Sequence, residues 1–191
     1  LDGGRAFCSK TITVEERKDW SDTGCSAISD FENIYNREAW GQDGADVRFG
    51  AEFDYELVSQ MDDGDDGVTL DGESLEGNTL GRRRHYTLDI VSKANYSNGY
   101  STGKGWVDWD GPGDHPPELI MDKNYPNIMF DHQQPVSVEI TVPDWATDQV
   151  CFRFINKYFI VDVGGYNENA SSGEVEDYVV NITSGPFLSD W

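Results

Sequence analysis

The sequence predicts an all-β protein, an antiparallel β-sandwich of about seven to nine strands with a jelly-roll or immunoglobulin-like topology. Three observations support this fold class. Apolar and polar residues alternate strictly along several segments of the second half, turn-forming residues cluster between those segments, and no stretch has the period of an amphipathic helix. The length of 191 residues fits one domain of ordinary size or one large β domain.

Four segments show the alternation most clearly, for example through Val136, Val138 and Ile140. Such a pattern is typical of strands with one buried face and one face in contact with water. The predicted strands lie at 86–90, 136–142, 150–154 and 178–182. Clusters of Gly, Pro, Asn and Asp are expected to separate the strands at 95–99, 111–117, 124–127 and 164–173.

The first part of the chain is less regular. Residues 11–14 fit a strand, and the remainder of residues 1–60 has too little periodicity to assign. Residues 62–76 carry seven acids and no base, which indicates a loop around a short strand at 68–70.

The composition excludes several function classes. With 36 acidic and 14 basic residues, the net charge of −22 leaves no basic stripe for nucleic acid or for an anionic membrane surface. No stretch of about 18 consecutive apolar residues is present, so membrane insertion is not expected. Self-repulsion at this charge is commonly relieved by bound cations or by a salty medium, and both suit an extracellular setting.

The three cysteines, Cys8, Cys25 and Cys151, allow one disulfide with three choices of pair. A structural disulfide favours a compartment outside the cytosol. Residues 1–5 have no apolar core of a signal peptide, so we expect the sequence to be the mature form of a secreted protein.

Three groups of acids are candidate metal ligands, and calcium is the expected ion because it prefers six to eight oxygen ligands. The first group lies in a stretch bent by Gly64 and Gly67. Its members are Asp62, Asp63, Asp65 and Asp66. The alternative interpretation is a solvated acidic turn.

The second group follows the aromatic residues near 106–109. Its members are Asp108, Asp110, Asp114 and Glu118. Pro112 stands where a further carboxylate would strengthen the site, and the alternative is a tight hairpin with exposed acids.

The third group begins the last predicted strand. Its members are Glu174, Glu176 and Asp177. Glu174 and Glu176 are expected on one face of that strand and Asp177 on the other. These acids either complete a cation site or accept hydrogen bonds from a neighbouring turn.

No catalytic constellation is found, so no catalytic residue is assigned. His85, His115 and His132 lack the spacing of a helical zinc motif, and there is no nucleophile elbow or phosphate-binding loop. The six tryptophans suggest glycan binding as an alternative, because exposed Trp rings stack on sugars, although Trp also fills sandwich cores.

The segment Gly-Glu-Val-Glu-Asp-Tyr at 173–178 resembles the signature of the GEVED domain family. Four further motifs agree in order with that family. They lie at 65–68, 106–118, 140–146 and 151–154. The resemblance covers roughly residues 62–183, so we divide the chain into an N-terminal extension or additional strands at 1–61, the GEVED-like sandwich at 62–183 and a tail at 184–191.

The resemblance implies a secreted bacterial or archaeal cell-surface module without assigned catalytic activity. We therefore expect a calcium-stabilised structural or adhesion protein of the cell surface or extracellular matrix. Its partners would be other surface proteins, glycans or further copies of itself joined by strand addition. The alternatives are an extracellular carbohydrate-binding module and a metal-dependent hydrolase.

Overall fold

The structure is a computed structural model of the whole chain. It describes residues 18–20, 23–32, 35–37, 47–49, 67–94, 99–113, 115–128, 134–158, 164–167 and 173–184. The elements in these ranges are β1 (Lys18–Trp20), α1 (Thr23–Ile28), β2 (Tyr35–Arg37), β3 (Val47–Phe49), β4 (Val68–Leu70), β5 (Glu73–Ser74), β6 (Thr79–Gly81), β7 (His85–Ala94), β8 (Gly99–Asp108), β9 (Glu118–Ile128), β10 (Gln134–Thr141), β11 (Gln149–Tyr158) and β12 (Gly173–Thr183).

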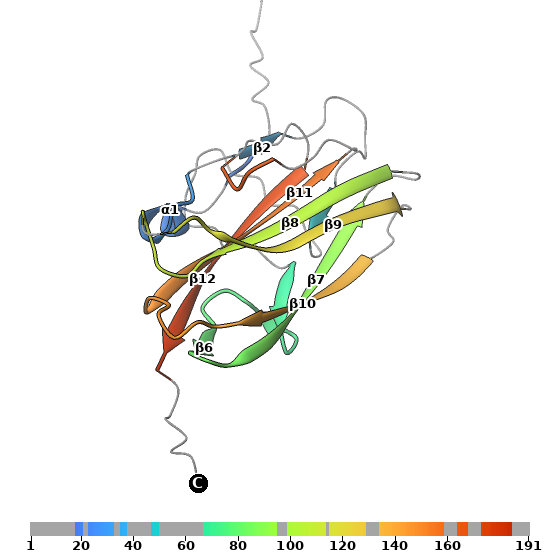
Figure 1. Cartoon of the computed structure of the whole chain (residues 1–191). Helices are drawn as coiled ribbons and strands as arrows, with labels where there is room; N and C mark the ends of the chain where they lie inside the picture. Colours follow the sequence, from blue (N-terminus) through green and yellow to red (C-terminus); the bar gives the residue numbers. More distant parts are fainter. Residues whose placement is uncertain are drawn as a thin grey trace, which may run out of the picture.

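Two five-stranded sheets form a sandwich, which confirms the predicted fold class (Figure 1). The first, here named the β7 sheet, has the order β10-β7-β4-β5, and β3 also pairs with β7. The second, here named the β11 sheet, has the order β6-β12-β11-β8-β9. All pairs within the two sheets are antiparallel except β12 with β6.

The core fills the space between the two sheets. The β7 sheet contributes fully buried Leu88 and Ile90, and the β11 sheet contributes Phe152 and Phe154. Phe154 packs edge-on against Tyr178, with ring centroids 6.0 Å apart. Each such apolar side chain contributes about 1.5–3 kcal/mol by leaving water. The apolar residues of the alternating segments therefore form the core, as the period of two predicts.

The strands predicted at 68–70, 86–90, 136–142, 150–154 and 178–182 are confirmed as parts of β4, β7, β10, β11 and β12. The predicted break at 124–127 is wrong, because β9 runs through it from Glu118 to Ile128. In the described sheet, β9 is an edge strand that pairs only with β8, and an edge strand tolerates a proline such as Pro126. A register shift opposite Gly99 and Ser101 absorbs the irregularity.

The two sheets differ in how their outer faces are covered. Strand β10 alternates between buried and more exposed residues, as expected for one wet face. In β12, residues 173–178 are all buried, so the expectation of one wet face is wrong for this strand. A second apolar cluster, formed by Cys25, Phe31, Trp106, Cys151, Ile155 and Val175, occupies the outer face of the β11 sheet. Helix α1 and residues 29–32 contribute the covering side of this cluster.

Several predictions fall outside the described residues, namely the strand at 11–14, Cys8, the acids at 62–66, Asp114 and the tail beyond residue 184. Among the described residues, no helix has the length and apolar character that a membrane span needs.

Candidate functional site

Strand β12 begins at Gly173, and this position requires glycine. Its φ angle is +142°, and a Cβ atom there would lie 1.9 Å from the carbonyl oxygen of Asn156 on β11. Any other residue would force the two strands apart. The glycine therefore brings the following acids into close contact with β11 and with the opposite sheet.

Glu174 and Glu176 lie on the inner face of the β11 sheet, and both are almost fully buried. The Glu174 carboxylate accepts a hydrogen bond from the backbone N–H of Phe49. The Glu176 carboxylate accepts one from the backbone N–H of Gly67 at 3.2 Å and one from the hydroxyl of Tyr178 at 2.8 Å. Buried carboxylates with hydrogen-bond donors of this kind avoid much of the cost of leaving water.

These two backbone N–H groups mark a break in the β7 sheet. Strand β3 pairs with β7 up to the Phe49–Ser92 pair, and β4 continues along β7 from the Val68–Ile90 pair. Residues 50–66 connect the two strands in the sequence. Glu174 and Glu176 thus bind the residue before that segment and the residue after it.

The ends of the segment also lie close to each other. A Cβ atom on Gly67 would be 2.2 Å from the Cβ atom of Phe49 and 2.6 Å from Oε2 of Glu176. Only glycine fits there. The first predicted group, Asp62 to Asp66, directly precedes Gly67 in the sequence and lies outside the described residues.

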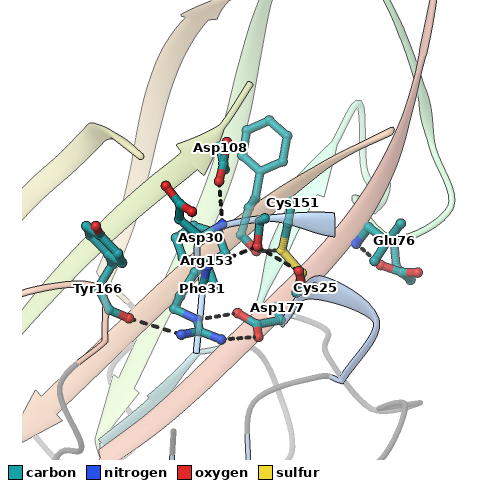
Figure 2. Close-up of a disulfide and its surroundings, with 12 residues drawn as sticks. Cys25, Asp30, Phe31, Glu76, Asp108, Cys151, Arg153, Tyr166 and Asp177 are labelled. Atoms are coloured by element: carbon teal, nitrogen blue, oxygen red, sulfur yellow. Dashed lines mark hydrogen bonds and ion pairs between the residues drawn. A yellow bond between two sulfur atoms is a disulfide. The ribbon is translucent and has the colours of Figure 1, made fainter. Parts of the chain in front are cut away.

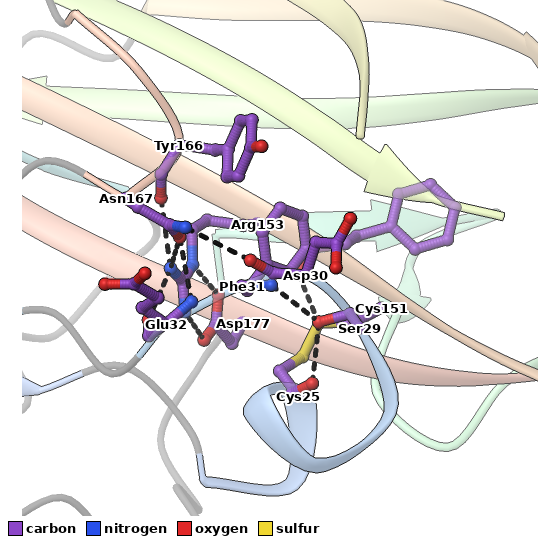
Figure 3. Close-up of polar contacts among 11 residues, drawn as sticks. Cys25, Ser29, Asp30, Phe31, Glu32, Cys151, Arg153, Tyr166, Asn167 and Asp177 are labelled. Atoms are coloured by element: carbon purple, nitrogen blue, oxygen red, sulfur yellow. Dashed lines mark hydrogen bonds and ion pairs between the residues drawn. A yellow bond between two sulfur atoms is a disulfide. The ribbon is translucent and has the colours of Figure 1, made fainter. Parts of the chain in front are cut away.

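Asp177 points to the outer face of β12, where it forms an ion pair with Arg153 of β11 (Figure 3). The guanidinium binds the carboxylate through two hydrogen bonds, Nε to Oδ1 at 2.8 Å and Nη2 to Oδ2 at 2.7 Å. Both side chains are 0% exposed. The remaining nitrogen, Nη1, donates to the carbonyl oxygens of Glu32 at 2.8 Å and Tyr166 at 3.0 Å. The Phe31 ring lies 4.7 Å from the guanidinium carbon.

A disulfide between Cys25 and Cys151 lies beside this ion pair and resolves the pairing that the sequence left open (Figure 2). It joins α1 to β11 across 126 residues of sequence. The two sulfur atoms and an Asp177 oxygen lie within 4.8 Å of one another, but the sulfurs are oxidised and the carboxylate is paired with Arg153. This group therefore does not offer thiolate ligands to a metal.

Further hydrogen bonds hold residues 29–32 against the β11 sheet. The side-chain amide of Asn167 donates to the Asp30 carbonyl at 3.1 Å, and its oxygen accepts from the Glu32 N–H at 2.8 Å. The Asp30 N–H donates to the Asp108 carboxylate at 2.6 Å. The Asp30 carboxylate accepts from the Gly113 N–H at 2.8 Å. We name residues 25–32 the clasp, because they are fixed to the sheet by these bonds, by the disulfide and by Arg153.

In the second predicted group, the described acids have different partners. Asp108 is buried, and besides Asp30 it accepts a hydrogen bond from Gly111 N–H at 3.0 Å. Burial raises the pKa of the Asp108 carboxyl above its ordinary value, against the opposing effect of its backbone donors. Asp110 binds Nδ1 of His115, and Glu118 accepts from Nε1 of Trp109 at 2.9 Å. Ion binding by this loop stays a prediction.

The structure thus separates the predicted acids into three places. Glu174 and Glu176 bind Phe49 and Gly67, Asp177 lies on the opposite face, and Asp108, Asp110 and Glu118, the described acids of the second group, lie at 108–118. Sequence reasoning missed the functional partners of Asp177, namely Arg153 and the clasp. A single arginine in an apolar strand of so acidic a chain was the available signal, since such a base needs a buried acid.

The fold and these contacts define a β-sandwich domain in which buried carboxylates hold strands and loops together. Residues 102–181 match the sequence profile of the GEVED domain, which confirms the predicted resemblance for this part of the chain. The matched range includes the motifs at 106–118, 140–146, 151–154 and 173–178, and it does not include the acidic motif at 65–68.

No relative is found among curated protein sequences. Among solved structures, the chain is similar to the CARDB domain of a Pyrococcus furiosus protein, which was crystallised in complex with di-metal ions. The sequences are 10% identical, the similarity covers 61% of this chain and 84% of that chain, and the TM-score is 0.37. At this level the similarity carries no argument about function.

Proposed function

We propose that this chain is an extracellular, non-catalytic β-sandwich module that calcium stabilises and that acts in cell-surface or matrix assembly. The observation that carries the proposal is the use of the signature acids. Glu174, Glu176 and Asp177 are each at most 3% exposed, and they accept hydrogen bonds from Phe49, Gly67 and Arg153, respectively. Carboxylates used in this way stabilise a scaffold, since a substrate in solution does not reach them.

An extracellular location is supported by the disulfide. Cys25 and Cys151 are fully buried and join two distant parts of the chain. Structural disulfides of this kind persist in oxidising compartments and are rare in the cytosol. The match to the GEVED domain agrees with this location.

Calcium stabilisation is supported by the place where the first acidic stretch ends. Asp65 and Asp66 immediately precede Gly67, whose N–H binds Glu176. Glu174 is two residues before Glu176 on the same face and binds Phe49, the residue before the connecting segment. Several oxygen ligands from one acidic segment, whose flanking residues Phe49 and Gly67 are held close together, suit Ca²⁺. Binding would also offset part of the self-repulsion of a chain with charge −22.

Assembly is supported by the edges of the sandwich. Strand β10 lies at one end of the β7 sheet and strand β9 at one end of the β11 sheet, and each is paired on one side among the described residues. An unpaired strand edge offers backbone N–H and C=O groups to a strand of another chain. The proposed partners are further copies of this chain or other surface proteins.

The test of the calcium proposal is the melting temperature of the full chain with millimolar calcium and with chelator. Calcium at about a hundredfold excess over Kd would add about 2.7 kcal/mol and raise the melting temperature by roughly 5–10 °C. We expect the double variant Asp65→Asn, Asp66→Asn to lose most of this rise.

The matched control is the double variant Asp71→Asn, Glu73→Gln. It removes two exposed acids from the β4–β5 turn and so changes the net charge by the same amount. The control should respond to calcium as the unmodified chain does. Equal loss in both variants would indicate unspecific charge screening, and no calcium response in the unmodified chain would remove the proposal.

A further inference from the structure

Trp145 lies at the surface and belongs to neither apolar cluster of the sandwich. Its side chain is 59% exposed, and in the described part of the chain only Leu119 joins it as an exposed large apolar residue. Trp106 and Trp109, in contrast, are buried in the two apolar clusters. An exposed indole ring does not contribute the large stabilisation that burial would give. A Trp at the surface therefore suggests a role in binding.

The turn that carries Trp145 is held firmly. The carbonyl oxygen of Ala146 accepts two hydrogen bonds from the Arg82 guanidinium, at 3.1 and 2.8 Å. On the other side of the turn, Val142 exchanges backbone hydrogen bonds with Arg83 and Arg84, at 2.8 and 3.0 Å. The backbone that carries the indole is therefore held in place, which lowers the entropy cost of binding a ligand there.

One polar ring lies beside the indole, and an ion pair involves the residue next to it in the sequence. The His115 ring lies 5.9 Å from it, tilted by 44°, and is itself bound by Asp110. On the neighbouring residue, the Asp144 carboxylate is paired with Arg83. Arg83 has a φ angle of +62°, which is unusual for a residue with a long side chain and recurs at functional sites.

We propose that Trp145, with His115 beside it and the Asp144–Arg83 ion pair on the same turn, forms a binding site for a neutral glycan. One face of a pyranose ring presents C–H groups that stack on the electron-rich face of an indole, and its hydroxyl groups need charged or polar partners at the rim. A single exposed indole with His115 beside it fits that ligand. A protein partner is less well matched, since hot-spot tryptophans lie within a wider apolar patch.

The charges of the protein favour a neutral glycan over an anionic one. Both arginines that flank the turn are paired with acids, Arg82 with Asp148 and Arg83 with Asp144. The chain as a whole has a charge of −22 and repels anionic polysaccharides. The site shares no residue with the acidic stretch at 62–66 that is proposed to bind calcium, so it is tested in chelator.

The experiment is affinity electrophoresis of the full chain in gels containing β-glucan, galactomannan or, as the anionic comparison, polygalacturonate. We expect at least one neutral polysaccharide to retard the chain. Trp145→Ala should weaken binding about tenfold or more, and Trp145→Phe, which keeps an aromatic face, should retain part of it. Leu119→Ala, at the other exposed apolar residue, should bind as the unmodified chain does.

The proposal is overturned if no neutral polysaccharide retards the unmodified chain, if only polygalacturonate does, or if Trp145→Ala binds equally well. If both variants have the melting temperature of the unmodified chain, a loss of binding is not a loss of folding. Since every gel contains chelator, these outcomes do not depend on the calcium test.

Discussion

The two sheets of the sandwich use the outer faces of their strands in opposite ways. On the β7 sheet, polar residues of the outer face lie in water and pair locally, as Asp89 does with the Ser137 hydroxyl at 2.7 Å. On the β11 sheet, the corresponding positions are buried under the clasp, and Asp177 pairs there with Arg153 at zero exposure. The same alternation along the chain therefore produces a solvated face in one sheet and a second interior in the other.

The comparison shows what the covering segment does. The clasp closes the outer face of β11 and β12 with the Cys25–Cys151 disulfide, the Phe31 ring and the carbonyl of Glu32. An ion pair in water contributes little to stability, whereas a buried pair with satisfied hydrogen bonds is costly to break on one side only. Because the clasp buries Asp177, the ion pair of this residue with Arg153 becomes important for the stability of the fold.

The largest effect should come from removing one member of the buried pair. Asp177→Ala leaves the Arg153 guanidinium buried without its carboxylate, so we expect the free energy of unfolding to fall by about 3–5 kcal/mol. Urea unfolding followed by tryptophan fluorescence measures the change. Asp89→Ala, at a similar position on the β7 sheet, should change the free energy by no more than about 0.5 kcal/mol. Similar losses in the two variants would contradict the difference between the sheets.

A smaller or comparable effect is expected from opening the disulfide. The double variant Cys25→Ala, Cys151→Ala removes a cross-link that spans 126 residues, and we expect a loss of about 2–5 kcal/mol. Hydrogen exchange should increase first at the clasp amides of Asp30 and Glu32, which donate to the side chains of Asp108 and Asn167. If exchange increased equally across β7 and β10, the clasp would not be a distinct covering unit.

The smallest effect concerns pH and Asp108, which anchors the clasp through the Asp30 amide. Burial raises the pKa of this carboxyl, so the folded state binds its proton more tightly than the unfolded state does. The stability that this tighter proton binding contributes is therefore fully present below the ordinary Asp pKa. It is lost as the pH rises through the raised pKa of Asp108. We expect Asp108→Asn to become more favourable relative to the unmodified chain across that window. Denaturant unfolding between acidic and neutral pH tests the sign, and a difference that stays constant would contradict it.

The sequence was sufficient for the fold class and for the strands whose alternation is strict. It did not predict β9, because Asn124 and Pro126 look like a turn when the edge position of the strand is unknown. Nor did it predict the double burial of β12, which depends on a segment about 150 residues earlier in the chain. The face assignment of Glu174, Glu176 and Asp177 followed from the period of two, but their partners are long-range contacts that no local pattern contains.

The most direct test of the calcium-stabilised scaffold is amide hydrogen exchange at Phe49 and Gly67, the two residues whose N–H groups bind Glu174 and Glu176. Exchange is measured on the full chain with millimolar calcium and with chelator. The account predicts slower exchange at both amides in calcium, and loss of that slowing in the Asp65→Asn, Asp66→Asn variant. Identical exchange rates at both amides with and without calcium would contradict it.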